Sequence, residues 1–317
     1  MSHVLVLGGS GFLGASLCER LFERERGGGR ITVPTRRPGR SRHVLPLPTV
    51  QLVAADVHDD ATLARLLSGC DAVVNLVATL HGSEATFQHV HVDLPRRLAK
   101  ACHAAGVRRL VHVSALGAGE HAPSRYLRSK AAGEAVLRRA GLDLTLLRPS
   151  VMYGERDDFL NLFAKLQAFL PVLPLAGADA QFQPVWVEDV AEAIVRCLAD
   201  PGTIDQTIEC TGPKRYSLRE LVRFAGRSAG HRRPVIALPG ALATLQALVF
   251  EALPGTPLVS RDNLASMRVP NVASGQLPGL ERLGIVAADM ESVAPAWLDP
   301  RRGAARLNGW RSRAGRS

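Results

Sequence analysis

The stretch HVLVLGGSGFLG, residues 3–14, decides the fold of this chain. Its first five residues have the length and apolar character of a buried strand, a glycine-rich turn follows, and residues 15–25 continue as a helix. A pyrophosphate can lie on such a turn only if no side chain blocks it, and the free N–H groups at the start of the helix then meet its charge. We therefore expect a dinucleotide site that contains Gly8, Gly9, Ser10, Gly11, Phe12, Leu13 and Gly14.

After this turn, apolar runs of strand length alternate with helical patterns up to about residue 150. The expected strands are 30–35, 50–54, 72–78, 108–113 and 143–147, and the expected helices are 59–67, 87–105 and 124–139. This alternation predicts an α/β fold, a Rossmann-like doubly wound parallel sheet whose ligand crevice lies at the carboxyl ends of the strands. A smaller C-terminal α/β lobe is expected to follow it.

The chain has 317 residues, 46% of them hydrophobic, which is enough for one large α/β domain with a smaller annex. We expect an NADP-binding Rossmann domain over residues 1–154, with parts of 176–200 returning to it, and a smaller substrate or lid lobe over 155–299. Residues 300–317 contain six arginines and no acid, so they carry +6 of the formal net charge of +10. We expect this basic segment to be a disordered tail.

The composition also narrows the partners and the location of the protein. A remaining charge of +4 and only three tryptophans and three tyrosines argue against nucleic-acid binding. The five cysteines form no C-x-x-C pair, so neither a metal site nor a disulfide framework is expected. No signal peptide is expected before the first strand, and prolines and glycines interrupt the apolar stretch 235–259. We predict a cytoplasmic protein, with peripheral contact at the inner face of the membrane as a further expectation.

Arg36 and Arg37 follow the second expected strand, where this fold places the adenosine ribose. An acid there would bind the free ribose hydroxyl of NAD, whereas a guanidinium binds the extra phosphate of NADP. The sequence therefore favours NADP(H), with Arg36 as the first candidate; the alternative is an ordinary solvated basic loop. The end of the fourth strand should pass the nicotinamide ribose, so Val77 and Ala78 are expected to contact the cofactor through their backbone.

Three residues form the candidate catalytic group: Ser114 at the end of the fifth strand, and Tyr126 with Lys130 in the following helix. Tyr126 and Lys130 are four residues apart, so both side chains share one helical face. A lysine ammonium beside a tyrosine hydroxyl favours the phenolate and also binds the nicotinamide ribose, while a serine hydroxyl holds the substrate oxygen. The pattern is typical of a hydride-transfer site, although Tyr-x-x-x-Lys also occurs by chance.

The glycine spacing, with Phe12 and Leu13 before the last glycine, resembles the extended and atypical branches of the short-chain dehydrogenase/reductase superfamily, which include the NAD-dependent epimerases and dehydratases. The resemblance implies that Asp56 and Val57 lie against the adenine ring. The signature Arg-Pro-x-x-x-Tyr-Gly at residues 148–154 recurs in the extended branch. It implies that the backbone after Pro149 lines the nicotinamide side.

Three longer segments narrow the resemblance: residues 126–134, 148–161 and 183–190. They look like the family that includes the NADPH-binding accessory subunit of respiratory complex I, the alpha-subcomplex subunit 9 type, and its bacterial relatives. The resemblance covers roughly residues 3–290. It implies a tightly held NADPH, a Rossmann-like fold and, in the mitochondrial member, a structural role in place of turnover.

These features predict an NADP(H)-binding, short-chain dehydrogenase/reductase-like protein that transfers hydride on a hydrophobic carbonyl or alcohol of quinone- or isoprenoid-like character. The apolar C-terminal lobe motivates this substrate class, although core packing also explains such residues. One alternative is a non-catalytic NADPH-binding module of a respiratory (NADH dehydrogenase) complex. Another is a nucleotide-sugar epimerase or dehydratase, which the short segment from Ser114 to Tyr126 disfavours. His91, where the extended branch often has asparagine, is expected to form structural hydrogen bonds.

Overall fold

The computed structural model describes residues 3–41, 44, 46–255 and 257–299, so the arginine-rich segment 300–317 lies outside the described residues. Two compact units make up the chain. The first, which we call the sheet unit, contains the described residues up to Pro149 together with Val187–Cys210 and Ala273–Val286. The second unit contains Ser150–Trp186, Thr211–Val272 and the described residues from Ala287 onward.

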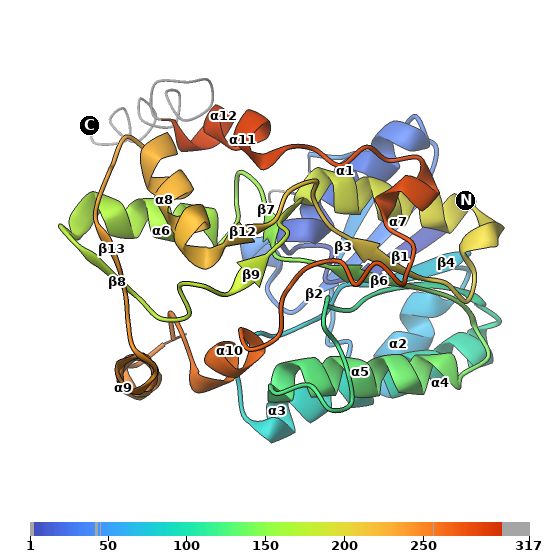
Figure 1. The fold of residues 1–317 in the computed structure, drawn as a ribbon. Helices are drawn as coiled ribbons and strands as arrows, with labels where there is room; N and C mark the ends of the chain where they lie inside the picture. The colour runs from blue at the N-terminus through green and yellow to red at the C-terminus, as the bar shows by residue number, and fades with distance from the viewer. Residues whose placement is uncertain (1–2, 42–43, 45, 256, 300–317) are drawn as a thin grey trace. The chain divides into compact units, whose positions relative to one another are not determined.

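The sheet unit is built on a seven-stranded sheet in which every pairing is parallel (Figure 1). Its strands are β1 (His3–Leu7), β2 (Arg30–Thr35), β3 (Val50–Ala54), β4 (Ala72–Asn75), β5 (Arg109–Val113), β6 (Asp143–Pro149) and β11 (Thr207–Cys210). Their order is β11-β6-β5-β4-β1-β2-β3. The six strands from β3 to β6 have the order of a Rossmann sheet, with its switch point between β1 and β4. The predicted α/β fold is therefore confirmed, and β11 extends the sheet beyond β6.

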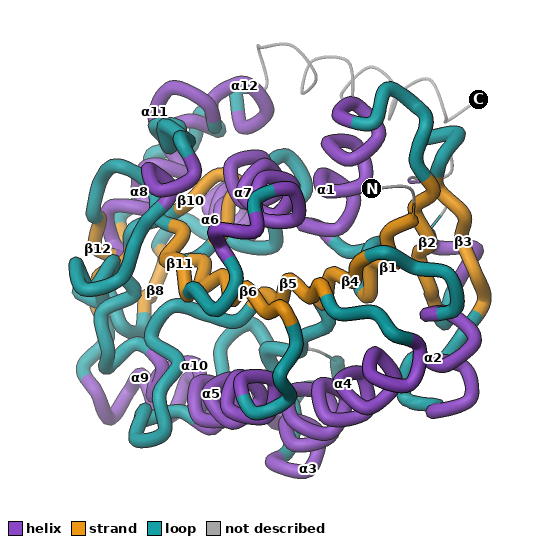
Figure 2. Tube along the Cα trace, turned by 90° about the vertical axis from the view of Figure 1, so that its right-hand side faces the viewer, coloured by secondary structure: helices purple, strands orange, loops and turns teal. Residues whose placement is uncertain are grey.

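Helices cover both faces of this sheet (Figure 2). One face carries α1 (Phe12–Arg24) and α7 (Val187–Ala199), and the other carries α2 (Asp60–Leu67), α4 (Leu94–Ala105) and α5 (Arg125–Arg138). Short 3₁₀ turns lie at Pro38–Arg40, Pro201–Thr203 and Leu280–Leu283. Helix α1 buries Leu13, Leu17 and Leu21, a spacing of four residues that places them on one face. Because helices bury both faces of the sheet, its inner strands are apolar nearly throughout.

The predicted fourth strand and the helix predicted after it differ from the structure. The fourth strand is predicted up to Ala78, but β4 ends at Asn75, whose side-chain oxygen accepts the N–H of Val77 outside the sheet. The predicted helix 87–105 consists of α3 (Glu84–Gln88), a π-helical turn at His89–Asp93, and α4. Pro95 accounts for the π turn, because it has no N–H for the carbonyl of His91 four residues earlier and its ring crowds that carbonyl in a regular α-helix.

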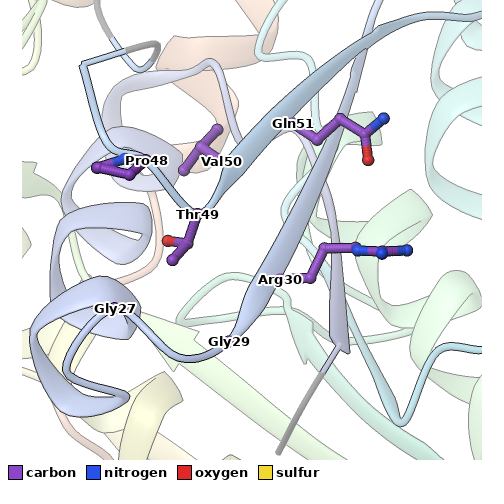
Figure 3. A pocket seen from close by; sticks show the side chains of 7 residues that line it. All are labelled: Gly27, Gly29, Arg30, Pro48, Thr49, Val50 and Gln51. Atoms are coloured by element: carbon purple, nitrogen blue, oxygen red, sulfur yellow. The ribbon is translucent and has the colours of Figure 1, made fainter.

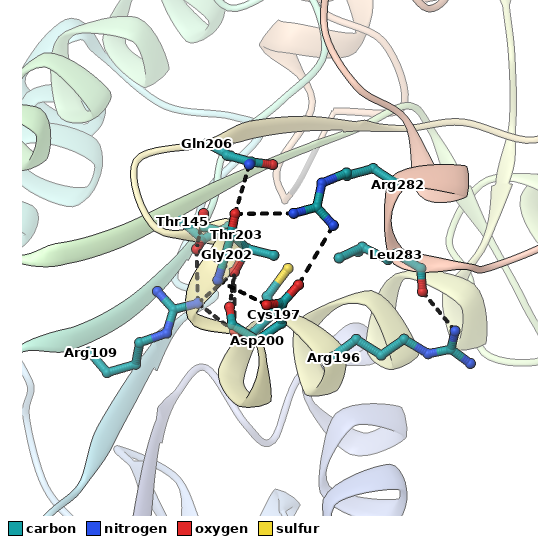
Figure 4. Close-up of polar contacts among 10 residues, drawn as sticks. All are labelled: Arg109, Thr145, Arg196, Cys197, Asp200, Gly202, Thr203, Gln206, Arg282 and Leu283. Carbon is teal, nitrogen blue, oxygen red and sulfur yellow. Dashed lines mark hydrogen bonds and ion pairs between the residues drawn. The ribbon is translucent and has the colours of Figure 1, made fainter.

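A partly buried arginine on β5 ties the sheet to the end of α7 (Figure 4). Arg109 donates hydrogen bonds to the carbonyl of Asp143, to the hydroxyls of Thr145 and Thr203, and to the carbonyl of Cys197. The last carbonyls of a helix have no partner within the helix, and Arg109 supplies one for α7.

The segment Ala273–Val286 joins the sheet unit in the same region (Figure 4). Arg282 donates to the carbonyl of Gly202 at 3.2 Å, and Arg196 on α7 donates to the carbonyl of Leu283 at 2.7 Å. These bonds attach a late part of the chain to the Rossmann sheet, which the sequence alone does not predict.

Replacing Arg109 by leucine is expected to lower the free energy of unfolding by about 3 kcal/mol, because several buried acceptors lose their donor at once. Arg108→Leu is the matched control, since Arg108 is exposed and makes an ion pair with Asp143 at the surface. Its loss should cost less than about 1 kcal/mol. Urea unfolding of both variants measures the difference, and equal small effects would show that Arg109 does not hold α7 to the sheet.

The second unit contains three two-stranded sheets, β10-β7, β12-β9 and β13-β8, and six helices among its described residues. Its strands are β7 (Met152–Tyr153), β8 (Leu173–Leu175), β9 (Gln181–Phe182), β10 (Val185–Trp186), β12 (Tyr216–Ser217) and β13 (Val235–Ala237). Its helices are α6 (Leu160–Phe169), α8 (Leu218–Ser228), α9 (Gly240–Ala252), α10 (Arg261–Ser266), α11 (Met290–Val293) and α12 (Pro295–Leu298). The core forms where α6 packs on α8, with Leu160, Leu221 and Phe224 buried.

Three further structural features concern all the described residues. Within the described ranges, no helix combines the length and the apolar character needed to cross a bilayer. The same residues contain no group of three or more His, Cys, Asp or Glu side chains that could hold a metal ion. All five cysteines are free and buried, and burial raises the pKa of the Cys18 thiol to about 12, so these thiols are unreactive at neutral pH.

Candidate functional site

The residues predicted for the site follow the ends of six neighbouring parallel strands. The glycine turn follows β1, Arg36 follows β2, Asp56 follows β3, Val77 follows β4, Ser114 follows β5, and Pro149 ends β6. Because the strands are parallel, their carboxyl ends meet at one edge of the sheet. The candidate site is therefore this edge.

At the glycine turn, the backbone approaches itself so closely that side chains are excluded. Gly8 has a φ of +82°, a left-handed conformation that favours glycine. A Cβ on Gly14 would overlap the backbone of Gly8 and Gly9, so α1 can start this close to β1 only with glycine there. Gly11 is the N-cap of α1 and offers no side-chain cap, which leaves the first N–H groups of the helix for an anion. Of the other predicted turn residues, Leu13 is buried, whereas Ser10 and Phe12 are partly exposed.

At the β2 and β3 end of the edge, Arg36 and Arg37 have exposed side chains. The carbonyl of Thr35, the last residue of β2, accepts the N–H of Ala55 at 3.1 Å, so Arg36 follows directly beside the loop after β3. In that loop, Asp56 is exposed and accepts the N–H of His58 at 3.0 Å, and Val57 packs against the core. The structure thus brings Arg36 to the same loop as Asp56 and Val57.

At the end of β4, a buried polar pair sets the path of the chain. The Asn75 side chain donates from Nδ2 to Nδ1 of His112 on β5 and accepts the N–H of Val77 through Oδ1, both at 3.1 Å. Val77 is partly buried and Ala78 is exposed. Asn75 and His112 are not among the residues predicted for the site, although polar residues inside apolar strands are a sequence signal that could have identified them.

At the end of β5, Lys130 lies beside Ser114. The Lys130 ammonium is 2% exposed and donates to the carbonyl of Val113 at 2.8 Å. Burial lowers the pKa of Lys130 to about 8, and Glu134 partly opposes this shift. The hydroxyl of Ser114 is buried and has no hydrogen-bond partner among the described residues.

Tyr126 lies in the first turn of α5, whose N-cap Ser124 accepts the N–H of Leu127. Its ring makes edge contacts with Phe87 and His91, at centroid distances of 6.3 and 5.6 Å. Burial raises the pKa of Tyr126 to about 12. At neutral pH this phenol keeps its proton, and Lys130, which the sequence predicts to favour the phenolate, donates to the carbonyl of Val113 in this arrangement.

His91 links the loop after β4 to α5. Its Nε2 accepts the backbone N–H of Thr79 at 3.1 Å, which assigns the ring proton to Nδ1, and Nδ1 then donates to Oγ of Ser129 at 2.8 Å. Ser129 in turn donates to the carbonyl of Tyr126 at 2.7 Å. Burial, followed by the charge of Lys130, lowers the pKa of His91 to about 3, so the imidazole is neutral. These contacts agree with a structural role for His91.

Gly133 allows α5 to approach the π turn. A Cβ on Gly133 would overlap the carbonyl oxygen of His91, the same carbonyl that Pro95 deprives of its helical donor. This close contact places the start of α5, with Tyr126 and Lys130, against the segment that carries His91. From the sequence, this glycine is noted only as part of the run 126–134 that resembles a known family.

A buried ion pair attaches α5 to β6. Glu134 is 3% exposed and accepts two hydrogen bonds from Arg148, at 2.9 and 2.6 Å. The hydrogen bonds to Glu134 raise the pKa of the Arg148 guanidinium, which therefore stays charged. Next to Arg148, the carbonyl of Pro149 accepts the N–H of Leu116 at 3.0 Å, which connects the ends of β5 and β6.

A shallow pocket of about 350 Å³ lies elsewhere, at the amino-terminal ends of β2 and β3 (Figure 3). It is lined by Gly27, Gly29, Arg30, Pro48, Thr49, Val50 and Gln51. None of the residues predicted for the site belongs to it. Ligands of doubly wound sheets bind at the carboxyl ends of the strands, so we do not assign this pocket to the site.

Residues 4–210, which run from β1 to β11, match the model of the NAD dependent epimerase/dehydratase family. The chain belongs to this family. Among individual proteins, it is similar to NADH dehydrogenase [ubiquinone] 1 alpha subcomplex subunit 9 of rat mitochondria, with 32% identity over 292 residues, which cover 90% of this chain and 77% of the rat protein. The predicted resemblance to the subunit 9 type is thereby confirmed.

A bacterial relative is named for an enzymatic activity. The chain is 32% identical over 267 residues to the ceramide reductase of Caulobacter vibrioides, a match that covers 81% of this chain and 80% of that protein. Solved structures show the same fold: UDP-glucuronic acid 4-epimerase from Bacillus cereus has a TM-score of 0.66 at 18% identity, over 84% of this chain and 94% of the other. The protein gox2253 has a TM-score of 0.71 at 22% identity, over 100% and 99% of the two chains.

Proposed function

We propose that this chain binds NADP(H) at the carboxyl edge of its sheet and transfers hydride between the nicotinamide and a hydrophobic carbonyl or alcohol. The observation that carries the proposal is the pair of groups at the end of β5. Lys130 is enclosed at the carbonyl of Val113, and the adjacent Ser114 hydroxyl is buried without a partner among the described residues. Buried amines and unpaired hydroxyls are costly, and a bound ligand would complete their bonding here.

The glycine cradle fits the pyrophosphate of a dinucleotide, because Gly8 and Gly14 leave room that a Cβ would fill. The exposed N–H groups at the start of α1 would bind the phosphates, with Arg36, Asp56 and Val57 at the adenosine end. At the other end, Lys130 and the backbone of Val77 and Ala78 would hold the nicotinamide ribose, and the backbone after Pro149 would line the nicotinamide side. The domain boundaries at residue 154 and in 176–200 remain part of this proposal.

When bound, the reduced nicotinamide supplies a hydride for the carbonyl carbon of the substrate. Ser114 donates a hydrogen bond to the carbonyl oxygen, and Tyr126 transfers its phenolic proton to the same oxygen, so an alcohol leaves the site. A tyrosine that is protonated at neutral pH is the form that reduction requires. Lys130, when charged, stabilises the phenolate that remains.

The preference for NADP(H) over NAD(H) is assigned to Arg36. Replacing Arg36 by glutamate is expected to weaken NADPH binding about 30-fold and to leave NADH binding nearly unchanged, because a charge-assisted bond to the phosphate becomes a repulsion. Arg37→Glu is the matched control, because it makes the same charge change at the next residue of the chain. It should weaken NADPH binding by less than about fivefold. Fluorescence titration with both nucleotides measures this, and an equal loss of NADH affinity in Arg36→Glu would contradict the assignment.

The proposed substrate class is hydrophobic. The similarity to a ceramide reductase supports it, since ceramide is a lipid. The short segment between Ser114 and Tyr126 offers little chain to surround a nucleotide-sugar, which places an epimerase or dehydratase below a reductase. This ranking of a reductase above an epimerase is tested by comparing the oxidation of NADPH with long-chain ketones, with quinones and with a nucleotide-sugar. Turnover of the nucleotide-sugar alone would overturn this choice.

A second candidate function is a non-catalytic NADPH-binding module of a respiratory complex. The similarity to mitochondrial subunits of NADH dehydrogenase, from rat and from Neurospora crassa, supports it. In this case the protein should comigrate with NADH dehydrogenase activity when native membranes are separated under non-denaturing conditions, and bound NADPH should exchange slowly. Migration as a free protein with rapid nucleotide exchange would rule against this function.

A further inference from the structure

Two polar side chains lie inside the sheet unit, on the neighbouring strands β4 and β5. Asn75 and His112 are partners in the parallel register of these strands, and they are 1% and 2% exposed. Strands that helices cover on both faces are normally apolar, so buried polar side chains are retained there only where they make hydrogen bonds. The hydrogen bonds of this pair lead out of the sheet to the loop after β4.

The hydrogen bonds of Asn75 and His112 have one consistent arrangement. A backbone N–H can only donate, so the side-chain atom of Asn75 that meets the N–H of Val77 is the oxygen Oδ1. The amide nitrogen Nδ2 then faces His112 and donates to Nδ1 of the ring at 3.1 Å. Nδ1 is therefore an acceptor, and the ring proton is assigned to Nε2. His112 thus determines which way the Asn75 amide points.

His112 accepts this bond because its ring is neutral. Burial, followed by the nearby charges of Lys130 and His91, lowers the pKa of His112 well below its usual value. A protonated ring would carry a proton on Nδ1 and would turn one donor toward another, the Nδ2 group of Asn75. The buried ring therefore remains an acceptor at neutral pH.

Side chains hold the loop after β4 at two points. Asn75 accepts the N–H of Val77, and His91 accepts the N–H of Thr79 through Nε2, both at 3.1 Å. The loop also lies against the glycine turn, because a Cβ on Gly8 would be 3.3 Å from the backbone nitrogen of Val77. The path of this backbone is therefore fixed by the sheet on one side and by the π turn on the other.

We propose that His112 is a positioning residue for the nicotinamide end of the cofactor, and that it acts through Asn75 on the backbone of Val77 and Ala78. This inference rests on the proposed cofactor site, in which that backbone holds the nicotinamide ribose. Without an acceptor at Nδ1, the buried Nδ2 group of Asn75 would lose its partner, and rotating the amide would give up the bond to Val77. The adenosine end lies at β2 and β3, at the far side of β1, and does not depend on this pair.

Two substitutions of His112 separate positioning from packing. Leucine fills about the space of the imidazole but offers no acceptor, whereas asparagine is smaller and brings its side-chain oxygen close to the place of Nδ1. If His112 served packing alone, asparagine would be the more harmful change; if it positions the loop, leucine is. Each variant is titrated, as the full chain, with NADPH and with adenosine 2′,5′-bisphosphate, which lacks the nicotinamide and its ribose.

For His112→Leu we expect NADPH to bind about tenfold more weakly, the bisphosphate to bind as before, and the Val77 amide to exchange its hydrogen faster. For His112→Asn, both affinities and the exchange rate should stay within about threefold of the unchanged protein. An equal loss of affinity for both ligands would show a merely structural role and overturn the proposal, and so would an unchanged NADPH affinity in His112→Leu.

The experiment also separates this inference from the proposed function. It needs no turnover, so it judges the positioning role of His112 whether or not hydride transfer occurs. If the unchanged protein bound neither NADPH nor the bisphosphate, the proposed cofactor site itself would fail, and the positioning role would fail with it. If the unchanged protein bound both ligands and His112→Leu weakened neither, the positioning role alone would be wrong.

Discussion

Replacing Tyr126 by phenylalanine is expected to lower turnover with a hydrophobic carbonyl by about a thousandfold, because the phenolic hydroxyl is the proposed proton donor. The NADPH dissociation constant should change by less than about threefold, since the ring still contacts Phe87 and His91. Turnover is measured as NADPH oxidation against long-chain ketones and quinones, and affinity as the fluorescence of bound NADPH.

Tyr216→Phe is the matched control for this prediction. Tyr216 also has a hydroxyl with a raised pKa of about 12, and it donates to Glu291 in the second unit. Its removal should leave turnover unchanged. If Tyr126→Phe turned over as fast as the unchanged protein, Tyr126 would not be the proton donor. If the substitution acted only on the structure, NADPH affinity and thermal stability would fall together with turnover.

Replacing Gly133 by alanine is expected to lower the free energy of unfolding by about 4 kcal/mol or more, because its Cβ would meet the backbone carbonyl of His91 and not a movable side chain. Helix α5 must then move away from the π turn, so the bonds from His91 to Ser129 and Thr79 should weaken. Chemical unfolding gives the stability. Loss of NADPH affinity in the folded fraction reports the displacement of the site.

Gly240→Ala serves as the control for the same substitution. Gly240 is the first residue of α9 and a Cβ there meets no atom within 4 Å, so alanine should be neutral or stabilise the protein by up to about 1 kcal/mol. Equal stability of the two alanine variants would show that α5 does not depend on its contact with His91.

The fold was predictable because patterns within short stretches of the sequence determine its strands, turns and helices. Residues 3–14 combine a buried strand, a glycine turn and a helix start, and the alternation after them allows few arrangements other than a doubly wound sheet. Parallel strands bring their carboxyl ends to one edge, so Ser114 and Arg36 could be assigned to the same edge from the sequence. The detailed roles of these residues in cofactor binding and catalysis stay predictions.

The contacts that organise the site were not predictable in the same way. The chain from Thr79 through His91 to Ser129 joins residues far apart in the sequence, and the ion pair of Glu134 with Arg148 joins a helix to a strand. No local pattern specifies such partners. The protonation of Tyr126 depends on burial, which a four-residue spacing does not reveal, and the role of Tyr126 in catalysis stays a prediction. By contrast, Pro95 could have predicted the π turn.

The proposed NADP(H) site is tested most directly by releasing and identifying the nucleotide that copurifies with the protein, and then titrating the emptied protein with NADPH and NADH. We predict that NADP(H) is released and that NADPH binds at least about tenfold more tightly than NADH. The reason is that β2 is followed by Arg36, in the place where an NAD site would have an acidic residue. Tighter binding of NADH, or no binding of either nucleotide, would contradict the proposed site.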